Sequence, residues 1–177
     1  TVSVAADNNL GTAPGSATAG MLTLNGGTLQ TTASFTLNAN RGLSLGGSGG
    51  TSDVASATTL AYGGIAAGTG GLTKTSPGTL TLSGANTYSG ATTVSAGTLL
   101  VNGSQSGSAV SVNAGTLGGS GTAGAITSTT SGGALAPGSP AGSPGILNCG
   151  NLNLSASGSR SYVVQLNGTT AGSDYDQ

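Results

Sequence analysis

Residues 78–103 read GTLTLSGANTYSGATTVSAGTLLVNG, and the fold can be inferred from this stretch because it contains one phrase twice. The phrase GTLTLSG begins at Gly78, and its second version, GTLLVNG, begins at Gly97. Weaker copies begin at Gly115 and Gly133, so the four copies start at nearly equal intervals. A fixed period of about 20 residues is typical of solenoids, in which every repeat forms one turn of the structure.

Each copy has the pattern of a short strand that is buried on one face. Leu80 and Leu82 alternate with threonines, and Leu99 and Val101 take the same places one repeat later. This alternation predicts strands whose leucines point inward. One such unit cannot bury its apolar face alone, whereas stacked copies can. We therefore predict an all-β fold, a right-handed parallel β-helix with coils of about 18–20 residues.

The turns and the handedness follow from the same repeats. Glycine tolerates a positive φ and lets the chain bend sharply after each strand. Connections between parallel strands of one sheet are nearly always right-handed. The competing fold is a left-handed β-helix with six-residue steps, but Ser106 and Gly118 interrupt that series. About nine coils at ~4.8 Å per step would give a rod roughly 40–45 Å long. The glycines that close three of the copies are Gly84, Gly103 and Gly121.

The composition indicates one ordered repeat domain over residues 1–177. Glycine accounts for 35 of the 177 residues, but the charged residues that most disordered chains carry make up only 4%. Residues 33–70 repeat less regularly, so we expect an insertion in one of their coils. Pro137, Pro140 and Pro144 lie close together, which predicts a loop that leaves the stack near residues 136–145. We also expect the chain to be a fragment of a longer repeat protein.

Charge and cysteine content limit the partners. The net charge is −1, and the only basic residues, Arg41, Lys74 and Arg160, lie far apart in the sequence. Nucleic-acid binding needs clustered basic residues, so we expect no nucleic-acid partner. No apolar run reaches the length of a membrane helix, and we expect no membrane insertion by this segment. Cys149 is the only cysteine, and we predict that it is a small buried residue; the alternative is an intermolecular link.

Residues suited to catalysis or metal binding are few. The chain has no histidine, which excludes the Ser-His-Asp and Cys-His systems. Its carboxylates are Asp7, Asp53, Asp174 and Asp176, and the last two flank Tyr175 in what we interpret as a solvated end. The glycine run 46–50 lacks the aspartate of calcium-binding repeats and is interpreted as a flexible turn. We predict no catalytic, cofactor-binding or metal-binding residue, no cofactor and no enzymatic activity.

Outward-facing residues could still bind a ligand. Thr79, Thr98 and Thr116 should align on the outer surface, where a rank of hydroxyls could contact ice or sugar. We interpret them as a ladder suited to strands, because Leu100 and Gly118 replace the second threonine of the first copy. The tyrosines could form a glycan-stacking surface, although packing or coil capping is the favoured interpretation. The four tyrosines are Tyr62, Tyr88, Tyr162 and Tyr175.

Residues 71–99 strongly resemble the autotransporter-associated β-strand repeat, also called the passenger-associated transport repeat. The matching segments are GLTKT from Gly71, GTLTLSG from Gly78, NTYSG from Asn86 and TTVSAGTL from Thr92. Ser76 departs from the pattern, since family copies usually have glycine there. The resemblance implies a right-handed parallel β-helix that is exported and is displayed on, or released from, a bacterial cell surface.

Three functions are compatible with these observations. The first is a non-enzymatic structural module, a rod, stalk or filament that continues into further coils or associates end to end, because we see no charged cap at either end. The second is an adhesin that binds glycan or a cell-surface partner through a lateral face. The third is an enzyme, which would require that Asp7, Asp53, Arg41 and Lys74 come together in one groove.

Overall fold

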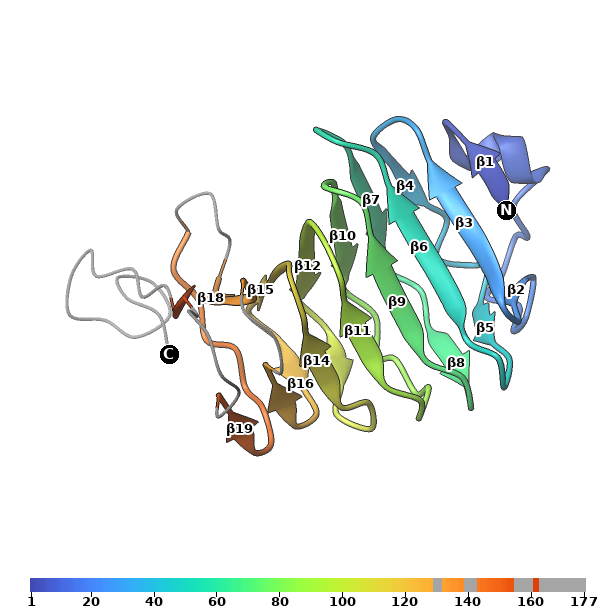
Figure 1. Cartoon of the computed structure of the whole chain (residues 1–177). Coiled ribbons are helices and arrows are strands. Elements are labelled where there is room, and N and C mark those ends of the chain that lie inside the picture. The colour runs from blue at the N-terminus through green and yellow to red at the C-terminus, as the bar shows by residue number, and fades with distance from the viewer. Residues whose placement is uncertain (129–131, 139–142, 155–160, 163–177) are drawn as a thin grey trace.

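The computed structural model describes residues 1–128, 132–138, 143–154 and 161–162, in which the chain winds through successive coils of short parallel strands (Figure 1). All pairings between named strands are parallel in this part of the chain. Its only helix is a single 3₁₀ turn, η1 (Asp7–Leu10). No described helix is long and apolar enough to cross a membrane. The structure thus confirms the prediction of an all-β parallel solenoid.

Two long sheets form most of the wall of the solenoid. Sheet A has eight strands, sheet C has seven, and the smaller sheets B and D have three and two. Sheet A contains, in spatial order, β1 (Val2–Val4), β3 (Gly27–Thr31), β6 (Gly50–Val54), β9 (Leu72–Thr75), β11 (Thr92–Val94), β14 (Val110–Val112), β17 (Ile126–Thr127) and β19 (Leu152–Asn153). Sheet C contains β4 (Phe35–Leu37), β7 (Thr59–Tyr62), β10 (Thr79–Leu82), β12 (Thr98–Val101), β15 (Thr116–Gly119), β18 (Ala134–Pro137) and β20 (Ser161–Tyr162). Sheet B contains β2 (Leu22–Leu24), β5 (Leu43–Leu45) and β8 (Ala66–Gly68), and sheet D contains β13 (Ser104–Gln105) and β16 (Thr122–Ala123).

The core is a stack of aliphatic side chains, one layer for each coil. In sheet C, Leu80 pairs in register with Leu60 on one side and Leu99 on the other. Leu99 pairs with Leu117, and Leu117 pairs with Leu135. All five are at most 7% exposed. The repeated leucines therefore lie above one another inside the coil, as the two-residue alternation predicted.

The coils shorten from β1 to β17, and the step from β17 to β19 is long again, since Ile126 pairs with Leu152. Val2 of β1 pairs with Leu29, whereas Thr92 of β11 pairs with Val110, which is a clearly shorter step along the sequence. Coils of the predicted length thus occur in the middle of the chain but not at its start. The prediction of about nine coils was wrong: the described chain makes about six. The first coils use more residues each, which accounts for the less regular sequence of residues 33–70. The handedness stays a prediction.

Glycine is needed at one corner of successive coils, but for a different reason from the one predicted. Gly84, Gly103 and Gly121 do not have positive φ values. A Cβ on Gly103 would instead lie 2.2 Å from the carbonyl oxygen of Gly84, and a Cβ on Gly121 would lie 2.0 Å from that of Gly103. Each glycine is needed because the backbone of the preceding coil occupies the place of a side chain. Positive φ occurs elsewhere, for example at Gly97 with φ 65°.

Two further predictions need correction near the end of the described chain. Pro137 is the last residue of β18 and is buried, and the Gly138 N–H donates to the Gly119 carbonyl oxygen over 2.8 Å, so the chain stays in the stack through residue 138. Residues 139–142 lie outside the described residues. Cys149 is exposed, whereas we predicted burial. It follows Asn148, which bridges to Thr122, while the apolar position in this segment is taken by buried Leu147.

Candidate functional site

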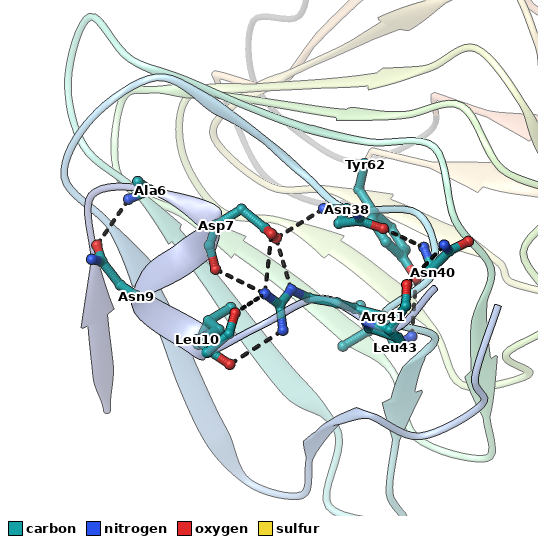
Figure 2. Close-up of polar contacts among 11 residues, drawn as sticks. Ala6, Asp7, Asn9, Leu10, Asn38, Asn40, Arg41, Leu43 and Tyr62 are labelled. Atoms are coloured by element: carbon teal, nitrogen blue, oxygen red, sulfur yellow. Dashed lines mark hydrogen bonds and ion pairs between the residues drawn. The ribbon is translucent and has the colours of Figure 1, made fainter. Parts of the chain in front are cut away.

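The four charged groups that an enzyme would need to gather lie in three separate places. Asp7 and Arg41 form an ion pair near the N-terminus, and Figure 2 shows that the guanidinium points into the curve of η1. Arg41 Nε lies 2.8 Å from Asp7 Oδ1, and Arg41 Nη2 lies 3.1 Å from Asp7 Oδ2. The guanidinium also donates to the carbonyl oxygens of Asp7, Leu10 and Gly11. We call this group of contacts the arginine clasp.

The arginine clasp uses the hydrogen-bonding capacity of both partners. The Arg41 side chain is only 4% exposed, and Asp7 Oδ1 also accepts from the Asn38 N–H over 2.9 Å. The hydrogen bond to Arg41 holds the pKa of Asp7 below its usual value, and the same bond raises the pKa of Arg41. The clasp thus fixes η1 against the end of β4. It is a charged contact at the N-terminal end of the stack, where we had predicted none.

Lys74 and Asp53 occupy opposite faces of sheet A. Lys74 points inward and is 0% exposed. Its Nζ donates to the carbonyl oxygens of Thr75 at 2.6 Å, Ser76 at 2.7 Å and Ala96 at 3.4 Å. Burial lowers the pKa of Lys74 to about 8, while the Asp53 charge acts in the opposite direction. Asp53 is half-buried on the outer face and accepts from Gln30 Nε2 over 3.2 Å.

Lys74 therefore has a structural role at a corner of the coil. Ser76 has a φ of 63°, which L-residues with side chains rarely adopt, and its carbonyl oxygen is one of the three that Lys74 holds. The described residues contain no group of three His, Cys, Asp or Glu side chains that could hold a metal ion. Asp174 and Asp176 lie outside the described residues.

The two tyrosines whose side chains are described point inward, so the hypothesis of a tyrosine surface is wrong for them. Tyr62 is 2% exposed; its hydroxyl accepts from the Leu43 N–H and donates to the Ile65 carbonyl oxygen. Tyr88 is 1% exposed, and burial raises its pKa. The structure describes neither the side chain of Tyr162 nor Tyr175.

Tyr88 belongs to a buried polar cluster that the sequence did not reveal. Its hydroxyl lies 2.7 Å from Thr92 Oγ1 and 3.1 Å from Gln105 Oε1, and Thr92 Oγ1 lies 2.8 Å from Ser108 Oγ. All four side chains are at most 1% exposed. Hydrogen-bonded polar groups in a core can fix one packing arrangement. The sequence does carry a signal for this cluster, because Thr92 and Ser108 are polar residues at inward positions of otherwise apolar repeats.

The outer face of sheet C has one polar rank and one mainly apolar rank. Thr79, Thr98 and Thr116 pair in register and are half-buried, so the predicted alignment of these hydroxyls is confirmed. In the neighbouring rank, Leu100 pairs with Thr81 on one side and Gly118 on the other.

The outer face of sheet A carries two polar ranks, and the sequence analysis missed them. Successive coils contribute one side chain each to a rank, and all the side chains of both ranks are half-buried on the outer face. The first rank follows the register Thr28, Thr51, Thr73, Thr93, Ser111 and Thr127. Two residues further along, Gln30, Asp53 and Thr75 pair in register as a second rank. Ser95 and Asn113, which directly follow β11 and β14, continue this rank. We call these two ranks the polar face.

Two surface depressions lie along the first coils. One, of about 450 Å³, is mostly apolar and is lined by small residues together with Leu43 and Ile65. The other, of about 280 Å³, is mostly polar and is lined by glycines and by Ser48, Thr51 and Thr73. Thr51 and Thr73 also belong to the polar face, so this polar depression adjoins it.

Comparison with known proteins agrees with the sequence resemblance. Residues 72–101, which run from β9 through β12, match the family model described as Passenger-associated-transport-repeat. The chain thus carries a repeat of the autotransporter-passenger type, here built as part of a β-solenoid. No curated protein and no solved structure gave a significant match.

Proposed function

We propose that this chain is a structural module of a secreted bacterial protein, a section of rod or stalk at the cell surface. The observation that carries the proposal is the in-register leucine stack of sheet C, which continues through the passenger-associated repeat. Such a stack extends by adding coils and needs no reactive group. The charged groups of Lys74 and Arg41 are already occupied by structural contacts: Lys74 donates to backbone carbonyl oxygens, and Arg41 donates to Asp7.

The N-terminal end of the stack offers an edge for association. The short strand β1 is the outermost strand of sheet A, and Val2 there is 56% exposed. An edge strand presents unpaired backbone groups to another chain. The arginine clasp holds η1 beside the end of β4 in sheet C, and β1 remains the outermost strand of sheet A. End-to-end pairing through sheet A is thus the form of self-association we propose.

Sedimentation velocity over about a hundredfold concentration range, combined with electron microscopy, tests this proposal. We expect association that grows with concentration and linear assemblies in the micrographs. Val2→Lys should abolish the association, because charge on an edge strand opposes pairing. The matched control is Ile65→Lys, which alters a residue that is 52% exposed on the side of the rod. Loss of association in Ile65→Lys but not in Val2→Lys would contradict the end-to-end arrangement.

A second candidate function is adhesion to a glycan through a lateral surface. The polar face of sheet A favours it, since six successive coils there present a polar side chain at the same place. A rod and an adhesive face are compatible functions, because one uses the ends of the solenoid and the other uses its side.

A further inference from the structure

We infer that the polar face of sheet A binds a neutral, extended polysaccharide whose sugar rings follow one another along the rod axis. This inference deepens the adhesin candidate and does not depend on end-to-end assembly. It rests on the spacing of the two ranks, on the charge of the face, on the positions of the exposed large hydrophobic side chains among the described residues, and on the adjoining polar depression.

The first argument is the regular spacing of the hydroxyls. Successive strands of a sheet lie about 4.7–4.9 Å apart, and side chains two residues apart on one strand are separated by about 6.6 Å. Thr51, Thr73 and Thr93 occupy three successive positions of this lattice. Their hydroxyls have no hydrogen-bond partner among the described residues. In a polymer of equatorially 1,4-linked pyranose rings, the distance from one ring to the next is similar to the distance between successive coils. Such a polymer presents hydroxyls along its edges.

The second argument is charge. Asp53 is the only charged side chain of the polar face, and Lys74, from the same sheet, points inward and is fully buried. A polyanion such as nucleic acid or an acidic polysaccharide would meet no cation there. A polar, almost uncharged surface complements a polar, uncharged ligand.

The third argument distinguishes a glycan from a protein partner. The cores of protein–protein interfaces contain large apolar or aromatic anchors. Among the described residues, the exposed large hydrophobic side chains lie outside the two ranks of the polar face. These exposed residues are Val2, Met21, Ile65, Leu152 and Leu154.

The polar depression supplies the concave part of the proposed site. Thr51 and Thr73 of the first rank line it together with Ser48 and glycine backbone. Its volume of about 280 Å³ is close to the lower end of the range for small-molecule pockets. We assign one sugar ring to this depression and the following rings to the rank beyond it. Hydrogen bonds repeated over several coils would then act together.

Titration calorimetry with cellohexaose and chitohexaose tests the inference on the whole chain. The test variant is Thr51→Val/Thr73→Val/Thr93→Val, which removes three hydroxyls and keeps a β-branched side chain that suits strands. The matched control, Thr79→Val/Thr98→Val/Thr116→Val, makes the same change on the outer face of sheet C. Circular dichroism and thermal unfolding of both variants would show that the coils remain folded.

We expect the unmodified chain to bind at least one of the two oligosaccharides. The sheet A variant should bind at least about tenfold more weakly, because it lacks three hydroxyls and the net free energy of even one hydrogen bond corresponds to about such a change. The sheet C variant should bind like the unmodified chain. Equal loss in both variants, or no loss in either, would overturn the inference. So would the absence of binding to both probes, stronger binding of heparin than of either probe, or activity of the face toward ice without glycan binding. None of these outcomes bears on the association measured with Val2→Lys.

Discussion

The first coils and the coils of residues 72–121 solve the same packing problem in different ways. The later coils repeat leucine at the same inward position in every turn, and glycine where backbones touch. The first coils are longer, as the pairing of Val2 with Leu29 shows, and are fixed by contacts that occur once, above all the arginine clasp. This contrast indicates that regular coils are stabilised by neighbours of the same kind, while the end of the stack needs a specific cover. Four substitutions test this contrast between the two regions.

The largest effect is expected at the leucine stack. Leu99→Ala removes a fully buried side chain between Leu80 and Leu117 and should lower the free energy of unfolding by about 2–5 kcal/mol, through lost burial and a cavity. Urea unfolding followed by circular dichroism measures the loss. The control is Leu100→Ala, the next residue on the outer face, where we expect less than about 1 kcal/mol. Equal losses in the two variants would contradict the inward stacking of Leu99.

The arginine clasp should have a large but local effect. Arg41→Ala leaves the carbonyl oxygens of Leu10 and Gly11 without their donor and removes the partner of Asp7. We expect a loss of about 2–3 kcal/mol of protection in the N-terminal coil, since one partner of a largely buried pair is missing. Hydrogen exchange read by mass spectrometry locates the change.

The contrast between the two regions predicts where protection survives. Residues 72–121 should exchange at an unchanged rate in Arg41→Ala, because their coils rest on one another. If exchange accelerates equally in both regions, then the clasp stabilises the whole solenoid and the two regions do not differ in the way proposed.

The glycine row should give an intermediate effect. Gly103→Ala places a Cβ about 2.2 Å from the carbonyl oxygen of Gly84, so the two coils must move apart. We expect a loss of about 1–3 kcal/mol, as for other overpacked positions. Gly107→Ala is the control, because its Cβ would approach nothing closer than 3.7 Å. Thermal unfolding should rank the two variants in that order, and the reverse ranking would refute close packing as the cause.

The smallest effect should come from the titration of Lys74. Its pKa is about 8 in the folded chain and near 10.5 in the unfolded chain, so the folded chain loses this proton at a lower pH than the unfolded chain does. The free energy of unfolding should therefore rise by about 1–2 kcal/mol between pH 8 and pH 10. Lys74→Met should remove this rise, although the variant is less stable at pH 7 because three carbonyl oxygens lose their donor. A rise that persists in the variant would show that another group titrates.

The sequence predicted those parts of the fold that repetition encodes. Leu80, Leu99 and Leu117 could be placed above one another because each copy of the phrase has the same inward position. The buried places of Arg41 and Lys74 could not be predicted, since each occurs once and its partners are backbone carbonyl oxygens that leave no sequence pattern. The polar face was missed because its residues come from strands whose spacing along the sequence keeps changing. The step from Thr28 to Thr51 is longer than the step from Ser111 to Thr127.

The spacing of the coils provides the decisive test of the solenoid. In a Cys149→Ser background, spin labels can be attached to pairs of introduced cysteines. The three pairs are Thr79→Cys with Thr98→Cys, Thr79→Cys with Thr116→Cys, and Thr59→Cys with Thr116→Cys. These pairs are one, two and three coils apart on the outer face of sheet C. Stacked parallel coils predict separations that increase in steps of about 4.8 Å in electron paramagnetic resonance. A Thr79–Thr116 separation no longer than that of Thr79–Thr98 would contradict the solenoid.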